Sequence, residues 1–249
     1  MHLASFRARP VYALYHFFWS ALDWIYPPTC GGCSQLGVRW CSTCQEQTIR
    51  LNIKTGCPRC GYELLNNGLC PNCQANTPVC TAIRSWGAYS GPLRAAVHRM
   101  KYNQDLGLTE LFSSHLNILL VELGWNVNLI TSVPLSRKRL RQRGYNQAAL
   151  LGWPMAVALN IPYVSQAIER TRDTSSQVGL SAKERLTNVV GAFHADPKLV
   201  NHKNVLVVDD VITTGATIQS CAQALIAAGA YQVFGLSLAR TLLHSDLPG

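Results

Sequence analysis

This sequence predicts an α/β fold, a parallel sheet covered by helices, with a small cysteine-rich metal module ahead of it. From Thr81 onward, short apolar runs alternate with segments of helical periodicity, which is typical of a parallel sheet. Eight of the ten cysteines form four C-x-x-C pairs within residues 30–73, a spacing typical of metal sites. With 249 residues, 48% of them hydrophobic, the chain can bury one ordinary core beside an accessory module.

The first 29 residues are expected to form an amphipathic helix that packs on the rest of the protein. Their apolar stretch, residues 11–26, contains Asp23 and stops at Pro27-Pro28. It is shorter than the about 20 apolar residues that cross a bilayer, and no small-residue cleavage site precedes the two prolines. We therefore expect no transmembrane segment, with contact to a membrane surface as the alternative.

Residues 30–80 contain few large apolar side chains, so this module needs a cross-link, such as a bound metal ion, in order to fold. Its cysteines supply two sets of four thiolates, spaced C-x2-C-x7-C-x2-C and C-x2-C-x9-C-x2-C. Four soft thiolates suit a tetrahedral Zn²⁺ ion. The expected ligands are Cys30, Cys33, Cys41, Cys44, Cys57, Cys60, Cys70 and Cys73.

Two interpretations of these cysteines stay open: two structural zinc ions, or one well-occupied zinc with a partly degenerate second site. The pairs combine either in sequence order or interleaved as a cross-brace, and the spacing does not decide between these arrangements. In both, a closed four-thiolate site leaves no open position for catalysis. Because metal binding needs free thiolates rather than disulfides, we expect a reducing, cytoplasmic setting.

Residues 81–249 are expected to form the sheet domain. The predicted strands are 83–89, 129–133, 205–208 and 233–239, and the predicted helices start at Pro92 or cover 107–123, 147–159 and 217–228. Such folds bind their ligands at the carboxyl ends of the strands. Pro134, Arg137 and Asp209 follow strands closely, so we expect the site at this edge of the sheet.

The segment from Val205 to Thr217 is the most informative part of the chain. Its four apolar residues predict a buried strand, Asp209 and Asp210 follow, and a turn rich in threonine and glycine opens a helix. The free N–H groups and the positive dipole end of such a helix suit a phosphate group. Two carboxylates beside it suit ribose hydroxyls or a hydrated cation, so the segment predicts a ligand with both phosphate and sugar.

Two further polar segments accompany this turn. Residues 137–143 hold five cations, and a shared anion, either pyrophosphate or nucleic acid, explains them better than a solvated charged loop. Residues 170–180 are polar and too long for a tight connection, as active-site lids are, with a plain surface loop as the alternative. The net charge of +9 also favours anionic partners. The absence of Gly-x-Ser-x-Gly and of a Gly-Lys-Ser/Thr phosphate loop argues against serine hydrolases and P-loop NTPases.

These motifs together resemble the ComF family, phosphoribosyltransferase-like proteins named for DNA uptake in competent bacteria. The segment from Val205 to Thr217 is similar to the phosphoribosyl pyrophosphate (PRPP) motif of type I phosphoribosyltransferases. The other features that carry the resemblance are the paired cysteine knuckles, Lys101-Tyr102, the Val133–Gln147 stretch, the Arg170–Leu180 stretch, Arg185, Asn188, Gly191-Ala192-Phe193 and Ala239-Arg240-Thr241.

The resemblance implies a type I phosphoribosyltransferase fold with an N-terminal double zinc ribbon. It implies that Asp209 and Asp210 hold the ribose 2′- and 3′-hydroxyls, directly or through Mg²⁺. Arg170 or Arg172 would close over the leaving pyrophosphate. The residues implied to bind PRPP are Lys101, Arg137, Lys138, Thr213, Thr214, Gly215, Ala216 and Thr217.

The function implied is a Mg²⁺-dependent transfer of the phosphoribosyl group from PRPP to an acceptor that the sequence leaves undefined. It would be linked to DNA uptake, competence or DNA processing, with competence or recombination proteins as further partners. The alternative is a non-catalytic factor that binds single-stranded DNA along its zinc knuckles and residues 137–143. A zinc scaffold for partner proteins is a third hypothesis. The intact pair Asp209 and Asp210 favours PRPP binding, because a scaffold does not need two carboxylates there.

Overall fold

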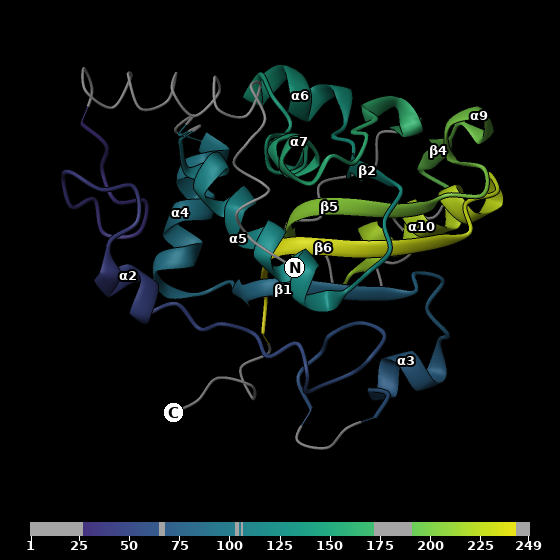
Figure 1. Cartoon of the computed structure of the whole chain (residues 1–249), viewed down its shortest axis with the longest axis horizontal. Coiled ribbons are helices and arrows are strands. Elements are labelled where there is room, and N and C mark those ends of the chain that lie inside the picture. Colours follow the sequence, from purple (N-terminus) through teal and green to yellow (C-terminus); the bar gives the residue numbers. More distant parts are fainter. Residues whose placement is uncertain (1–26, 65–67, 103–104, 106, 172–190, 243–249) are drawn as a thin grey trace.

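A four-stranded parallel sheet is the centre of the protein, in the strand order β1–β6–β5–β2 (Figure 1). Its strands are β1 (Ala82–Ala88), β2 (Leu129–Ser132), β5 (Asn204–Ile212) and β6 (Gln232–Arg240). This computed structural model describes residues 27–64, 68–102, 105, 107–171 and 191–242. The parallel sheet predicted from the alternation of strands and helices is thus confirmed.

The two inner strands explain the apolar runs of the sequence. In β6 every residue after Gln232 is buried, and in β5 the residues up to Val208 are buried on both faces of the sheet. The strand β5 does not end at Val208 as predicted. Its ladder with β6 continues until Ile212 lies opposite Arg240, so Asp209 and Asp210 lie within the strand.

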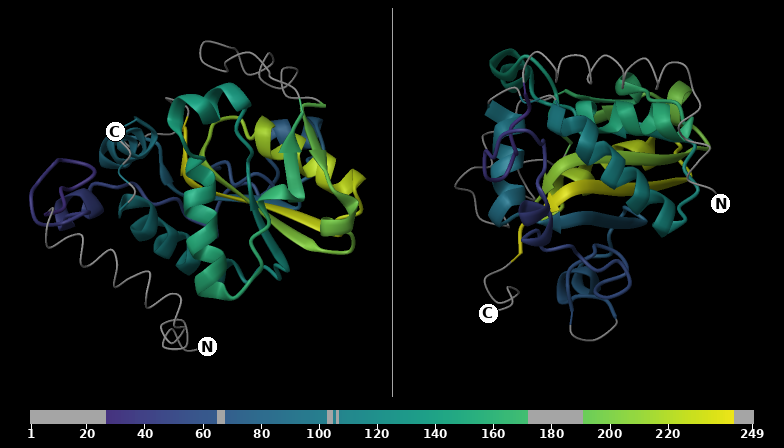
Figure 2. Two further views of the ribbon diagram at one scale, coloured as in Figure 1. Left: turned by 90° about the horizontal axis from the view of Figure 1, so that it is seen from above. Right: turned by 60° about the vertical axis from the view of Figure 1, so that its left-hand side comes forward.

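Helices cover both faces of the sheet. On one face lie α4 (Gly91–Tyr102), α5 (Gly107–Leu123) and α7 (Gln147–Leu159), whose large apolar side chains form one core cluster with Trp86. On the other face lies α10 (Ala216–Ala227), with Ile218, Cys221 and Leu225 buried in a second cluster (Figure 2). The bounds predicted for α5 and α7 are confirmed, because their apolar residues recur at helical spacing.

A small antiparallel sheet was not predicted. It pairs β3 (Ile168–Arg170) with β4 (Phe193–Ala195) and packs against α10, with a 3₁₀ turn, Ser165–Ala167, before it and α9 (Pro197–Val200) after it. Three-residue strands give no periodic signal, and only the partner strand fixes them. The pairing places Arg170 beside Phe193, on the two sides of residues 172–190, which lie outside the described part.

The segment predicted as a basic loop is a helix, α6 (Arg137–Arg143). The Ser136 hydroxyl accepts a hydrogen bond from the N–H group of Arg139 and so caps the start of the helix. Gly144, with a φ of 78°, closes its end in the left-handed region. Neighbouring cations are only one or two positions apart along the helix, so they fall on different faces rather than along one extended track.

The cysteine module follows the β1 edge of the sheet. Its two short helices are α2 (Ser42–Glu46) and α3 (Pro71–Ala75), and Figure 1 shows them near opposite ends of β1. The predicted N-terminal helix lies outside the described residues except for its last positions, 27–29. Within the described part, we find no helix whose length and hydropathy would let it cross a membrane.

Candidate functional site

A cavity of about 960 Å³ opens at the carboxyl ends of the central strands, at the edge of the sheet where the sequence predicted the site. Its walls come from the end of β5, the start of α10, the last turn of α4, one face of α6 and the end of β3. Segments far apart in the sequence therefore contribute to one opening. The cavity contains the acidic pair, most of the threonine-glycine turn and several basic side chains, among them Lys101, Arg139, Arg143 and Arg170.

Asp210 forms an ion pair with Lys101 from α4 across the cavity. The Lys101 Nζ atom lies 3.1 Å from Asp210 Oδ2, and both side chains are largely buried, with 18% and 13% of their surface exposed. The neighbouring carboxylate, Asp209, accepts a hydrogen bond of 2.9 Å from the N–H group of Asp210. Lys101 was predicted only from the family resemblance, and the structure places its ammonium group against the acidic pair.

The two acids are not electrostatically equivalent. Burial and, next, the neighbouring Asp210 carboxylate together raise the pKa of Asp209 to about 8, against the opposing effects of Lys101 and of the Asp210 N–H group. At neutral pH Asp209 therefore retains a proton for much of the time. A cation or a set of hydroxyl donors placed beside this pair would relieve the repulsion and let both carboxylates ionise.

The turn after β5 lines the cavity and leads directly into α10. Gly215 adopts a φ of 80° and forms the N-cap of α10, a left-handed conformation that glycine adopts without strain. The Thr214 hydroxyl accepts a hydrogen bond from the N–H group of Ala216. Of the predicted phosphate-binding residues, Thr213, Gly215, Ala216 and Thr217 line the cavity.

The basic wall of the cavity differs in detail from the sequence prediction. Arg137 and Lys138 belong to α6, but they are not among the residues that line the cavity. The side chains that do so are Arg139, Gln142 and Arg143, which share one helical face. Had residues 137–143 been predicted as a helix, the spacing of three and four positions between Arg139, Gln142 and Arg143 would have identified this face.

Arg143 also belongs to a small aromatic group at the mouth of the cavity. Its guanidinium carbon lies 5.4 Å from the ring centre of Tyr102, whose ring lies 4.6 Å from that of His98. Neither ring was predicted from the sequence to line the cavity. A helical projection of α4, on which residues 98 and 102 are four positions apart, could have found them.

Of the two arginines predicted to close over the site, Arg170 lines the cavity at the end of β3, where its guanidinium carbon lies 5.5 Å from the ring centre of Phe193. Arg172 and the rest of the predicted lid up to residue 180 lie outside the described residues.

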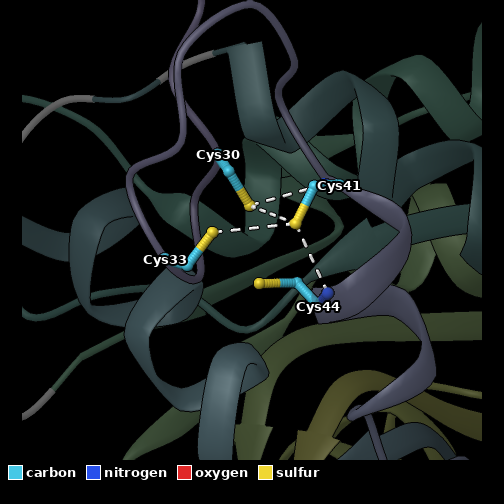
Figure 3. Close-up of side chains that lie close together, drawn as sticks. All are labelled: Cys30, Cys33, Cys41 and Cys44. Atoms are coloured by element: carbon cyan, nitrogen blue, oxygen red, sulfur yellow. Dashed lines mark hydrogen bonds between the residues drawn. The ribbon is translucent and has the colours of Figure 1, made fainter.

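The eight predicted metal ligands form two clusters in sequence order rather than a cross-brace. In each cluster the four sulfur atoms lie within 4.8 Å of one another, which fits tetrahedral coordination of one Zn²⁺ ion. The first cysteine cluster is Cys30, Cys33, Cys41 and Cys44, and Figure 3 shows its side chains converging on a shared centre. The second cysteine cluster is Cys57, Cys60, Cys70 and Cys73.

Backbone donors favour the thiolate of the first cysteine in each cluster, whereas burial and the neighbouring sulfur atoms raise the pKa of Cys44 and Cys73. Burial alone would raise the pKa of Cys30, but N–H groups of Cys33, Cys41 and Gly32 donate to its sulfur and lower the pKa to about 6. The pKa of Cys57 is lowered to about 6 by the equivalent donors of the second cysteine cluster, again against burial. The donor set and its N–H bonds thus fit two structural zinc sites.

Comparison with known proteins gives a consistent picture. The double zinc ribbon domain family matches residues 21–74. The chain is 34% identical over 211 residues to the DNA utilization protein YhgH of Escherichia coli (strain K12), which spans 81% of this chain and 90% of that protein. It is 32% identical over 209 residues to Competence protein F of Haemophilus influenzae, which spans 80% of this chain and 90% of that protein.

Among solved structures, the chain is similar to an adenine phosphoribosyl transferase from Trypanosoma brucei in complex with AMP, pyrophosphate and ribose-5-phosphate. The sequence identity is 14%, the TM-score is 0.40, and the match covers 70% of this chain and 89% of the other.

Proposed function

The chain belongs to the ComF family of competence and DNA-utilization proteins, and from this premise we propose that it is a PRPP-binding phosphoribosyltransferase that acts in the cytoplasm on the path of DNA uptake or processing. The observation that carries the proposal is the cavity in which the pair Asp209 and Asp210 faces the N-terminus of α10. A phosphorylated sugar needs both features, whereas a phosphate or a cation alone needs one.

Each wall has a place in the proposed reaction. The 5′-phosphate would accept hydrogen bonds from the backbone at Gly215 to Thr217, and Asp209 and Asp210 would hold the ribose hydroxyls. Arg139, Arg143 and Arg170 would face the pyrophosphate. The bond from C1 of the ribose to the pyrophosphate oxygen breaks and pyrophosphate leaves with the electron pair, while the acceptor forms its bond to C1.

The transition state of this displacement resembles an oxocarbenium ion, with positive charge on the sugar ring. The carboxylates beneath the sugar would stabilise that charge, and the arginines would stabilise the negative charge on the departing pyrophosphate. Asp209 and Asp210 offer the hard oxygen ligands that Mg²⁺ prefers, and Mg²⁺ bound there would supply further neutralisation of the pyrophosphate. Lys101 would hold Asp210 until the ligand arrives.

Titration calorimetry of the full chain with PRPP and Mg²⁺ tests this proposal. We expect measurable binding by the wild type and at least a tenfold loss of affinity in the double variant Asp209→Asn, Asp210→Asn, which keeps shape but removes both charges. Asp196→Asn is the matched control, because Asp196 caps α9 through a side-chain oxygen that asparagine also has. No binding heat with the wild type would overturn the proposal.

A second function, binding of single-stranded nucleic acid, is supported by the exposed ring of Tyr102 beside Arg143 at the mouth of the cavity. A base can stack on such a ring while the cation contacts a phosphate. We expect Tyr102→Ala to weaken binding of an oligodeoxynucleotide more than it weakens binding of PRPP. Affinity that falls steeply with salt in the wild type would support this role, and salt-independent affinity would contradict it.

A further inference from the structure

The second cysteine cluster rests on two arginines from the central sheet. Arg240, the last residue of β6, is 95% buried, and its Nη2 group donates a hydrogen bond of 2.5 Å to the carbonyl oxygen of Cys60. Arg84 of β1 donates from Nη1 to the carbonyl oxygens of Pro58, at 3.1 Å, and Ile83, at 2.8 Å. Both side chains thus reach the backbone beside the metal ligands.

The charge of these two arginines is balanced by the cysteines. Among the described residues neither guanidinium forms an ion pair with a carboxylate, and the negative groups that raise the pKa of each are thiolates of the second cysteine cluster. Four thiolates around one Zn²⁺ ion carry a net charge of −2. A buried cation without an anionic partner is strongly unfavourable, so the metal-bound thiolates are the counter-charge that makes the burial of Arg240 tolerable.

The backbone of Arg240 belongs to the wall of the cavity. Its carbonyl oxygen accepts a hydrogen bond of 2.6 Å from the N–H group of Tyr89, and it lies opposite Ile212 in the sheet. The next residue, Thr241, donates its N–H group to the carbonyl oxygen of Ile212 at 2.9 Å. Tyr89, Ile212 and Thr241 all line the cavity. One residue therefore contacts the metal module with its side chain and the cavity wall with its main chain.

We propose that Arg240 is a positioning residue that couples zinc binding at the second cysteine cluster to the cavity wall formed by Tyr89, Ile212 and Thr241. Its guanidinium compensates the charge of the metal-bound thiolates and holds the Cys60 carbonyl. When the metal leaves, most of the thiolates take up protons, so the counter-charge shrinks and the end of β6 loses part of its anchor. The zinc module in this account supports the site instead of serving only as a separate binding domain.

Chelator competition on the zinc-loaded full chain tests whether Arg240 supports zinc binding. Arg240→Met keeps much of the aliphatic stem and removes the charge. In this variant the zinc ion of the second cysteine cluster should bind about tenfold more weakly or worse, as is typical when a residue that contacts a metal ligand is changed. Arg59→Met is the matched control: Arg59 is an exposed residue between two ligands of the same cluster, and its guanidinium donates to the Thr81 carbonyl oxygen at 3.3 Å. It should stay within twofold of the wild type.

Amide hydrogen exchange tests whether zinc binding stabilises the cavity wall. Removal of zinc from the wild type should speed exchange at Tyr89 and Thr241, and in Arg240→Met exchange should already be fast with zinc present. Arg240→Lys, which keeps the charge, should retain most of the zinc affinity and covers the case in which the methionine variant does not fold.

Equal zinc affinities in Arg240→Met and Arg59→Met would overturn the proposal, as would unchanged exchange at Tyr89 and Thr241. Neither measurement uses PRPP, so a failure of this inference is distinct from a failure of the proposed function.

Discussion

The two cysteine clusters have the same ligands but contact the rest of the protein differently. The first cysteine cluster packs glycine backbone against side chains of the helices: a Cβ on Gly31 would meet Leu108 of α5 at 2.7 Å, and one on Gly32 would meet Pro92 of α4 at 2.8 Å. The second cysteine cluster meets the backbone of β1, where the N–H group of Ile83 donates to the carbonyl oxygen of Arg59 at 2.7 Å. Side chains can shift to make room, whereas the backbone of β1 is held by its ladder with β6.

Each cluster nevertheless uses an arginine on a ligand's carbonyl group. Arg99 of α4 donates to the carbonyl oxygen of Cys30 at 2.8 Å, as Arg240 does to that of Cys60. Arg99 also forms an ion pair of 2.6 Å with Asp105, so its charge is balanced without the metal. The first cluster is therefore attached by an arginine whose charge is already balanced, and the second by one whose charge needs the thiolates.

The largest expected difference in folding free energy comes from replacing one glycine beside each cysteine cluster. Gly61 has a φ of 70°, and a Cβ there would lie 2.7 Å from the backbone oxygen of Ile83, whereas Gly37 has a φ of 92° and open space around it. Gly37→Ala should cost roughly 1 kcal/mol of folding free energy, the penalty of the left-handed region alone. Gly61→Ala should cost roughly 3 kcal/mol or more, because the strand backbone does not move aside. Urea denaturation with zinc present measures both, and equal losses would show that the second cluster is as adaptable as the first.

A smaller effect is expected when Arg99 is changed. Arg99→Met removes hydrogen bonds to Cys30, Thr29 and Asp105 and should cost about 2 kcal/mol of folding free energy. Asp105→Asn should cost less than about 1 kcal/mol, because the partly exposed ion pair contributes little once the other two bonds remain. Thermal denaturation ranks the two variants. A loss in Asp105→Asn as large as in Arg99→Met would mean that Arg99, like Arg240, depends on its counter-charge.

The sequence predicted the parts of the site that local patterns encode. The alternation of apolar and polar residues located α5 and α7, the C-x-x-C spacing located all eight ligands, and the acids after an apolar run located the cavity edge. The roles of Arg84, Arg99 and Arg240 could not be predicted, because their partners lie 26, 69 and 180 positions away in the chain. The helix α6 was missed because seven residues, five of them charged, carry no apolar periodicity, although the Ser136 and Gly144 caps were visible.

The smallest effect concerns the segment that joins the two clusters. This segment runs antiparallel to β1, with the N–H group of Leu51 on the Trp86 carbonyl oxygen and that of Ala88 on the Ile49 carbonyl oxygen. Arg50 lies 4.5 Å above the ring of Trp86, which stacks at 4.7 Å on His115 of α5. The segment is therefore attached through a stack of a cation and two rings.

Burial, together with the charge of Arg50, lowers the pKa of His115 from 6.5 to about 4. Between these values an unfolded chain takes up a proton that the folded chain does not, so stability falls as the pH drops from 6.5 towards 4. We expect this histidine to account for about 1 kcal/mol of the loss by pH 5, reduced by its partial exposure. His115→Phe keeps a ring on Trp86 and removes the titration. Melting temperatures of the wild type and of His115→Phe at pH 7.5 and 5.0 separate this effect from zinc release, which lowers the stability of both proteins. An equal fall in melting temperature in the two proteins would assign the acid sensitivity to the cysteine clusters alone.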